Sequence, residues 1–226
     1  MSRIINILIA VIVIVVAYLT VRYAKEFYAS SPPSVESVKE LPHGLPATNF
    51  HAWREFTAPN QEFRVLLPIV PQHVADKILD PETKESRKFD TFVAATDQGA
   101  AFMISAITFP RKLEGDGAEE VLKGVINDML ARNKDNQLHA MNFANFRNYK
   151  AMDFSLSNGE LLIAGKVFIR GNALYILSMI NRGDLFDGKE LDFFINSFSI
   201  LKDSTKALPP SEMKGAAPQK NKGSKL

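Results

Sequence analysis

The 226-residue chain contains no cysteine. This absence excludes disulfides, thiolate catalysis and zinc sites built on cysteine. It does not fix the compartment, because many envelope proteins also lack cysteine. The folded part must therefore be stabilised by its core alone, and about 150 residues can bury enough apolar surface for that.

A strong positive charge is also missing from the part that is expected to fold. Residues 1–31 carry a net charge of +2 and residues 203–226 carry +3, so the whole-chain value of +2 leaves −3 for residues 32–202. The sequence pI of 8.7 is therefore a property of the two ends. Since a nucleic-acid groove needs clustered basic side chains, this distribution argues against DNA or RNA as a partner.

No local signature of catalysis or metal binding is present. The chain has no G-x-S-x-G and no H-E-x-x-H sequence. Its histidines, His43, His51, His73 and His139, are never two, three or four residues apart. Zinc would need ligands from separate elements, so we interpret these histidines as loop or surface residues. A catalytic set of serine, histidine and aspartate from distant parts of the sequence remains an open alternative, because such a set leaves no local sequence pattern.

Two glycine-containing motifs are interpreted as turns. Gly115-Asp116-Gly117 precedes an expected helix, which is where phosphate loops lie, but a third glycine is missing and Asp116, Glu119 and Glu120 would repel a phosphate. Arg182-Gly183-Asp184 matches an integrin-recognition tripeptide and falls in an expected loop between a strand and a helix. Three residues recur often by chance, so we expect a plain turn there.

Acidic residues gather around Pro81, and they alternate with lysine and arginine. General acid–base pairs need a buried carboxyl group with a shifted pKa, whereas this pattern is typical of a solvated loop. The acidic residues are Asp76, Asp80, Glu82 and Glu85. We therefore expect no catalytic, cofactor-binding or metal-binding residue, and a protein that is not an enzyme.

The most informative segment that is present runs from Ile4 to Val21. It reads IINILIAVIVIVVAYLTV and contains no charge over 18 residues. As a helix it would span roughly 27 Å, close to the thickness of the hydrocarbon layer of a bilayer. Asn6 lies near one end, and Tyr18 lies where an interfacial aromatic is expected. A buried core helix would normally show a polar face, so this segment predicts a single transmembrane helix.

We expect the apolar segment to remain attached as a signal-anchor. The residues that follow it carry several charges and offer no small-x-small cleavage site close behind the run. The positive-inside rule gives only a small preference for one orientation of this segment. Arg3 and the α-amino group on its N-terminal side nearly balance Arg22 and Lys25 on its C-terminal side. A short N-terminus before a single anchor usually stays in the cytoplasm. We therefore expect the domain to be extracytoplasmic, in a periplasm.

The chain is expected to divide into four parts. Proline, glycine and serine interrupt regular structure after the anchor, and a lysine-rich stretch with little apolar content closes the chain. The parts are an anchor (1–26), a linker (27–50), a soluble domain (51–202) and a disordered Lys-rich tail (203–226).

Within the domain, β-branched and aromatic runs separated by turn residues predict strands, and apolar residues at three- and four-residue spacing predict two helices. The expected strands are 62–67, 72–79, 88–96, 101–109, 138–146, 150–156, 160–170 and 173–180. The helices are expected to begin at Asp116 and Asp187, each with a glutamate three residues on. Gly171-Asn172 predicts a tight hairpin. The class is α+β, an antiparallel sheet with two main helices packed on it.

The order of these elements resembles a known family. Phe63-x-Val65-x-x-Pro68 comes early, a helix follows, Gly171-Asn-Ala-Leu174-Tyr175-Ile-Leu opens a late strand, and Phe194-x-x-Ser197-Phe198 closes the domain. Together they resemble the PsbP/Mog1-like fold, an α/β/α sandwich found in photosystem extrinsic proteins, a nuclear-transport factor and many bacterial envelope proteins. The resemblance implies a binding or assembly domain and identifies no functional residue. Members of the photosystem group carry a cleaved transit segment, from which this chain departs.

Two functions are expected from these observations. The first is a non-catalytic, membrane-tethered binding or assembly module of the bacterial cell envelope, with a membrane protein as its partner. The alternative is a domain that binds a lipid or small hydrophobic ligand, because core packing and an apolar pocket would use the same phenylalanines. These are Phe89, Phe92, Phe102, Phe109, Phe143, Phe146, Phe154 and Phe168.

Overall fold

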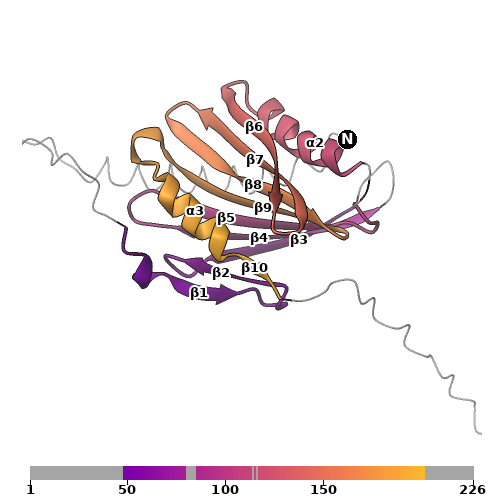
Figure 1. Ribbon diagram of the computed structural model, residues 1–226, viewed down its shortest axis with the longest axis horizontal. Helices are drawn as coiled ribbons and strands as arrows, with labels where there is room; N and C mark the ends of the chain where they lie inside the picture. The colour runs from indigo at the N-terminus through magenta and orange to yellow at the C-terminus, as the bar shows by residue number, and fades with distance from the viewer. Residues whose placement is uncertain (1–47, 80–84, 114, 116, 202–226) are drawn as a thin grey trace, which may run out of the picture.

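The computed structural model describes residues 48–79, 85–113, 115 and 117–201, which form two antiparallel sheets and two helices (Figure 1). The larger sheet has seven strands in the spatial order β3-β4-β5-β9-β8-β7-β6. Its strands are β3 (Gln72–Leu79), β4 (Ser86–Ala95), β5 (Ala101–Thr108), β6 (Asn136–Phe146), β7 (Tyr149–Asn158), β8 (Leu161–Arg170) and β9 (Ala173–Arg182).

The smaller sheet joins the beginning of the domain to its end. Its strands are β1 (Arg54–Thr57), β2 (Phe63–Leu67) and β10 (Ser199–Ile200), and β2 lies between the other two. A short 3-10 helix, η1 (Phe50–Ala52), precedes β1. The sequence predicts β2 but not β1 or β10, because each of these has at most four residues and is held by pairing with β2.

The eight predicted strands are confirmed, with their ends shifted by at most two residues. The β4–β5 and β8–β9 hairpins are both present. At the β8–β9 turn Gly171 has φ +61°, a left-handed conformation that favours glycine, and Asn172 fixes the turn by donating its side-chain amide to the Phe109 carbonyl at 2.8 Å. Period-2 alternation and turn residues thus determine this sheet locally.

The two helices pack on opposite faces of the large sheet. α2 (Ala118–Ala131) lies on β6, β7 and β8, and α3 (Gly188–Ser197) lies on β8, β9 and β2. Asp187 caps α3 as predicted, since its side chain accepts from the Lys189 N–H at 2.9 Å. The predicted start of α2 is wrong: the N-cap is Gly117, and Asp116 lies outside the described residues. Glycine needs no side-chain hydrogen bond to occupy this position.

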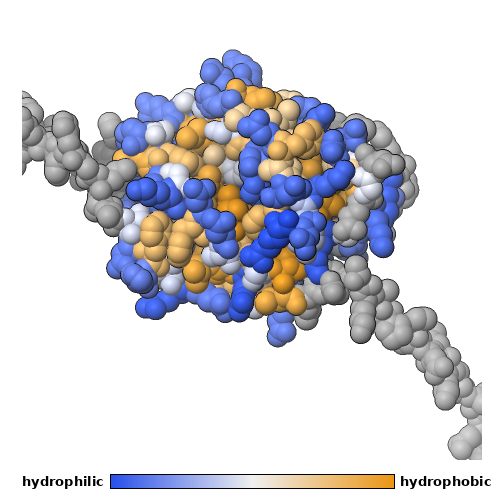
Figure 2. All heavy atoms as spheres, viewed as in Figure 1, coloured by the Kyte–Doolittle hydropathy of each residue, from blue (hydrophilic) through white to orange (hydrophobic). Residues whose placement is uncertain are grey.

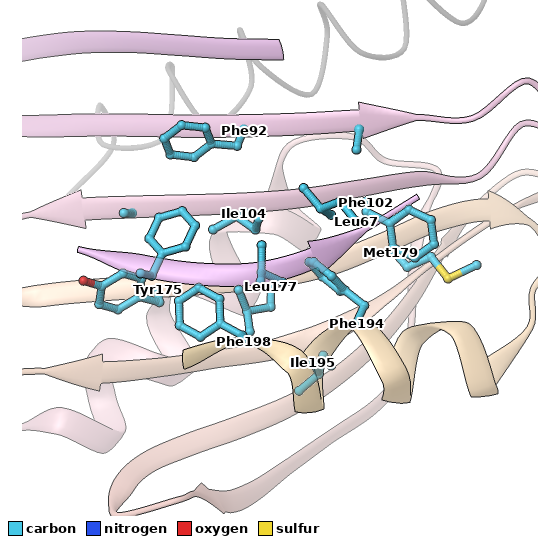
Figure 3. Close-up of a cluster of buried hydrophobic side chains, with 14 of the residues drawn as sticks. Leu67, Phe92, Phe102, Ile104, Tyr175, Leu177, Met179, Phe194, Ile195 and Phe198 are labelled. Atoms are coloured by element: carbon cyan, nitrogen blue, oxygen red, sulfur yellow. The ribbon is translucent and has the colours of Figure 1, made fainter. Parts of the chain in front are cut away.

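The core on the α3 side is aromatic, as Figure 3 shows. Phe198 is fully buried, and its ring lies 5.0 Å from Phe63, 5.8 Å from Phe168 and 5.8 Å from Tyr175, measured between centroids. The phenylalanines expected in the core are buried, with one exception. Phe143 is 47% exposed, because its strand β6 is an edge of the large sheet.

The buried phenol of Tyr175 is expected to make the stability of this core depend on pH. Burial raises the pKa of Tyr175 well above the ordinary value, and Glu62 acts in the same direction. The folded state keeps the phenol proton to higher pH than the unfolded chain, which releases it near pH 10. The stability that this group contributes is therefore complete below about pH 10 and is lost as the pH rises above it.

We expect the free energy of unfolding to fall above about pH 10 by up to ~1.4 kcal/mol per pH unit on account of Tyr175. Tyr175→Phe should remove that part of the slope. Urea midpoints measured from neutral pH to about pH 11 test this, with Tyr149→Phe, whose partly buried ring stacks on Phe168, as the matched variant. Equal slopes for the wild type and Tyr175→Phe would contradict the assignment.

No helix among the described residues is long and apolar enough to cross a bilayer. The segment of residues 4–21, the linker up to residue 47 and the tail from residue 203 lie outside the described part of the chain. The predicted transmembrane helix therefore stays a prediction.

Candidate functional site

A groove of about 380 Å³ lies between α3 and strands β6, β7 and β8 of the large sheet. The strands contribute Asp153, Ser155 and Lys166 to its wall, and the helix contributes Leu191 and Asp192. Figure 2, which views the α3 side of the molecule, shows hydrophilic and hydrophobic side chains interspersed over this face. The volume suits a few side chains of a partner or a small polar molecule.

An ion pair crosses the floor of the groove. Lys166 on β8 donates to the Asp153 carboxylate on the neighbouring strand β7, and the two residues are cross-strand partners. The Lys166 side chain is 13% exposed, whereas that of Asp153 is 49% exposed. With Asp192 on the opposite wall, two carboxylates face one ammonium group. The groove therefore favours a basic or amide-bearing group over an anion.

Side-chain hydrogen bonds hold α3 in place over this groove. The Thr48 hydroxyl donates to the Glu190 carboxylate at the start of the helix. At its end, the Ser197 hydroxyl accepts from the Leu66 N–H of β2 at 3.0 Å and donates to the Phe194 carbonyl at 2.7 Å. Both ends of the helix are therefore fixed, which gives the groove a defined width.

The sequence patterns missed this groove, although a signal for it exists. In β7, Met152 and Phe154 point toward α2, so the intervening Asp153 and Ser155 must point toward α3. Lys166 occupies the equivalent position on β8. A polar site could have been predicted from the charged residues at positions of these strands that face inward. The strand sequences do not show, however, that α3 forms the opposite wall of the groove.

A second polar cluster lies at the edge of the large sheet. His73 Nε2 on β3 is 3.1 Å from Asp90 Oδ1 on β4, and Lys88 Nζ is 2.6 Å from Asp90 Oδ2. The His73 ring stacks on Phe92 with 4.2 Å between centroids. This set of four contains no hydroxyl, so it does not form a serine, histidine and aspartate set. It joins edge strand β3 to the sheet.

The other two histidines that the structure describes do not converge with this cluster. His51 lies exposed in η1, and His139 on β6 bonds to the Ser157 hydroxyl at 2.8 Å. His43 is outside the described residues. Within residues 48–79, 85–113, 115 and 117–201, no three histidine, aspartate or glutamate side chains form a group that could hold a metal. The surface interpretation holds for His51, His73 and His139, although the last two lie on strands.

The glycine-containing motifs are surface features. Arg182 ends β9, Asp184 lies in the 3-10 helix η2 (Gly183–Leu185), and their side chains pair with each other at 2.7 Å. Gly115 has φ +120°, a turn conformation close to the start of α2. Both observations agree with the interpretation as turns.

The acidic cluster around Pro81 is only partly described. Asp76 is exposed, as expected, but it lies on strand β3 rather than in a loop, and its side chain accepts from the Lys77 N–H at 2.6 Å. Glu85 is partly buried next to β4. Asp80 and Glu82 lie outside the described residues.

No protein-family model matches the chain, and no curated protein matches it in sequence. Among solved structures, the chain is similar to cyanobacterial PsbP (CyanoP) from Synechocystis sp. PCC 6803, at 12% identity and a TM-score of 0.43 over 70% of this chain and 98% of that one. CyanoP bears the name of the family that the sequence resembles. At this identity nothing about function carries over.

Two further solved structures are similar to part of the chain. A Bacteroides thetaiotaomicron VPI-5482 protein matches at 18% identity and a TM-score of 0.33, over 66% of this chain and 48% of its own, so the match spans about half of that protein. A Pseudomonas aeruginosa protein of unknown function matches at 15% identity and a TM-score of 0.32, over 58% of this chain and 84% of its own.

Proposed function

We propose that the chain is a non-catalytic, membrane-tethered binding or assembly module of the bacterial cell envelope, with an extracytoplasmic domain of the PsbP-like kind. The observation that carries this proposal is the uncharged run of residues 4–21, placed ahead of a folded α+β domain. A tether confines the domain to the membrane surface. Its effective concentration near membrane proteins is then high, so weak contacts suffice for assembly.

The groove beside α3 is the contact point that the geometry favours. Its excess of carboxylates supports recognition of a lysine, arginine or amide side chain, and Leu191 and Ile195 supply apolar contact beside them. The alternative function, binding of a lipid or small hydrophobic ligand, gains less support from this groove. An acyl chain would displace water from Asp153, Lys166 and Asp192. It has no polar group that could replace the hydrogen bonds that these side chains make to that water.

We expect the full chain, expressed in bacterial cells, to remain in the membrane pellet after carbonate extraction. Val13→Arg combined with Val15→Arg should release it to the soluble fraction, because each arginine near the centre of a helix costs about 2.5–3.5 kcal/mol of insertion free energy. Replacing Lys220 and Lys222 with arginine is the matched control and should leave the protein in the pellet. Wild-type protein in the soluble fraction would refute the tethering.

The same membranes test the groove. Cross-linking followed by detergent purification should recover a membrane-protein partner with the wild-type chain and lose it with Asn196→Trp, which fills the groove. Asn127→Trp on the exposed surface of α2 is the control and should retain the partner. Recovery of the same partner with Asn196→Trp would show that the partner binds a different surface of the domain.

A further inference from the structure

The large sheet face that carries α2 is only half occupied by that helix. α2 makes its main contacts with β6, β7 and β8, while the same face continues across β9, β5 and β4. On those strands the side chains of this face are apolar or small, apart from Arg87 near the start of β4 and Arg182 at the end of β9. The apolar and small side chains include Thr91, Val93, Met103, Ser105, Ser178 and Ile180.

Part of this surface, hereafter the β4–β5–β9 face, forms an apolar cluster of its own. Ala101 and Ile180 are cross-strand partners and pack with Val93, Ala95 and Ile163, and none of these residues belongs to a helix. Even so, Met103 and Ile180 are each only 2% exposed.

A buried hydroxyl lies in the middle of this face. Ser178 is 1% exposed, and its Oγ has no hydrogen-bond partner among the residues that the structure describes. Nearby, the Thr91 and Ser105 hydroxyls satisfy each other at 3.2 Å. Gly165, the cross-strand neighbour of Ser178 on β8, has no side chain to stand above the sheet. A stripe of small residues with one unsatisfied hydroxyl allows a helix to approach closely, as small residues do where helices pack against one another.

The chain itself contains one segment suited to this surface. Residues 4–21 are uncharged, whereas the tail of residues 203–226 carries five lysines and residues 80–84 are too few. As a helix the segment would be roughly 27 Å long, which matches the length of an eight-residue strand such as β5. The intervening residues 22–47 can span up to about 85 Å when extended, so the segment can reach the face.

We propose that the β4–β5–β9 face binds residues 4–21 of the same chain as a helix whenever they are not in a bilayer, and that insertion into a membrane exposes the face. The second half of this inference rests on the proposed tethering function. In the aqueous state the docked segment shields both itself and the sheet from water. In the membrane the vacated face becomes available at the bilayer surface.

Cross-linking tests the docking directly, because a chain without cysteine allows clean cysteine pairs. The full chain would be made by cell-free synthesis without lipid, with Ser178→Cys combined in turn with Ile12→Cys, Val13→Cys, Ile14→Cys or Val15→Cys, which sample every side of a helix. Dibromobimane should join the two cysteines of at least one pair within the monomer. The control pairs Asn196→Cys, on the α3 side, with the same cysteine of residues 12–15. The Ser178→Cys pair should give at least tenfold more cross-linked product than this control.

Vesicles of phosphatidylcholine and phosphatidylglycerol test the release. Once the chain floats with the vesicles, the cross-link should fall at least tenfold and a maleimide should reach the thiol of the Ser178→Cys variant. Chain that fails to float but still forms the cross-link would refute the tethering and support the docking. If Ser178→Cys unfolds, which circular dichroism reports, Met103→Cys replaces it.

Three results would overturn the inference. In a folded aqueous chain, the absence of a cross-link from all four pairs rules out docking. Cross-linked dimers would assign the face to a second copy of the chain. A cross-link that is unchanged after flotation would show that insertion does not vacate the face.

Discussion

Gly165→Ala is expected to destabilise the domain by at least ~3 kcal/mol, which places it among the rare severe substitutions. A Cβ at this position would overlap the Leu177 carbonyl oxygen and come within 2.8 Å of Ser178 Cα on the adjacent strand β9. These are backbone atoms in the centre of a seven-stranded sheet, so they cannot move aside without breaking the β8–β9 ladder.

The matched control is Gly124→Ala in α2. A Cβ there meets nothing within 4 Å in the described part of the chain, and alanine is favoured over glycine inside a helix by about 1 kcal/mol, so this variant should be stabilised. Urea unfolding of both variants measures the two effects with one method. A Gly165→Ala midpoint equal to that of the wild type would show that the two strands separate more easily than this packing implies.

The second large effect is expected from Phe198→Ala. Phe198 follows α3 directly, is fully buried and packs against rings from β2, β8 and β9, so one side chain joins the small sheet, the helix and the large sheet. Truncation leaves a large cavity among rigid aromatic rings. We expect a loss of about 3–5 kcal/mol in the free energy of unfolding.

Phe143→Ala serves as the control for this truncation. The same atoms are removed from a half-exposed ring, which contacts the Lys123 ammonium 5.1 Å from its centroid. Its loss should cost only about 0.5–1 kcal/mol, the usual value of an exposed cation–π contact. Similar losses for the two variants in chemical denaturation would mean that the aromatic cluster around Phe198 is loosely packed.

The large sheet was predictable because its signals are local. Alternating apolar residues and turns such as Gly171-Asn172 specify each strand and each hairpin from neighbouring residues alone. The Asp187 cap was predictable for the same reason, since the capping side chain and its N–H partner are two residues apart. The predicted cap at Asp116 failed because a glycine nearer the helix can serve as the N-cap as well.

The groove and the small sheet were not predictable, because distant residues create both. β10 pairs with β2 across more than 130 residues, and two residues carry no periodicity of their own. Asp153 and Lys166 form a site only because α3, which follows them in the chain, supplies the opposite wall. Sequence patterns report which face a side chain is on but not what lies across from it.

The position of β2 between β1 and β10 has a mechanical consequence. The described chain enters the domain through β1 and leaves it through β10, and both are hydrogen-bonded to the same central strand. A pull between the two ends would therefore be borne by this three-stranded patch, while the seven-stranded sheet remains unloaded. Peeling of a two-residue strand would be the first event, so the domain should yield at its closing strand long before its body unfolds.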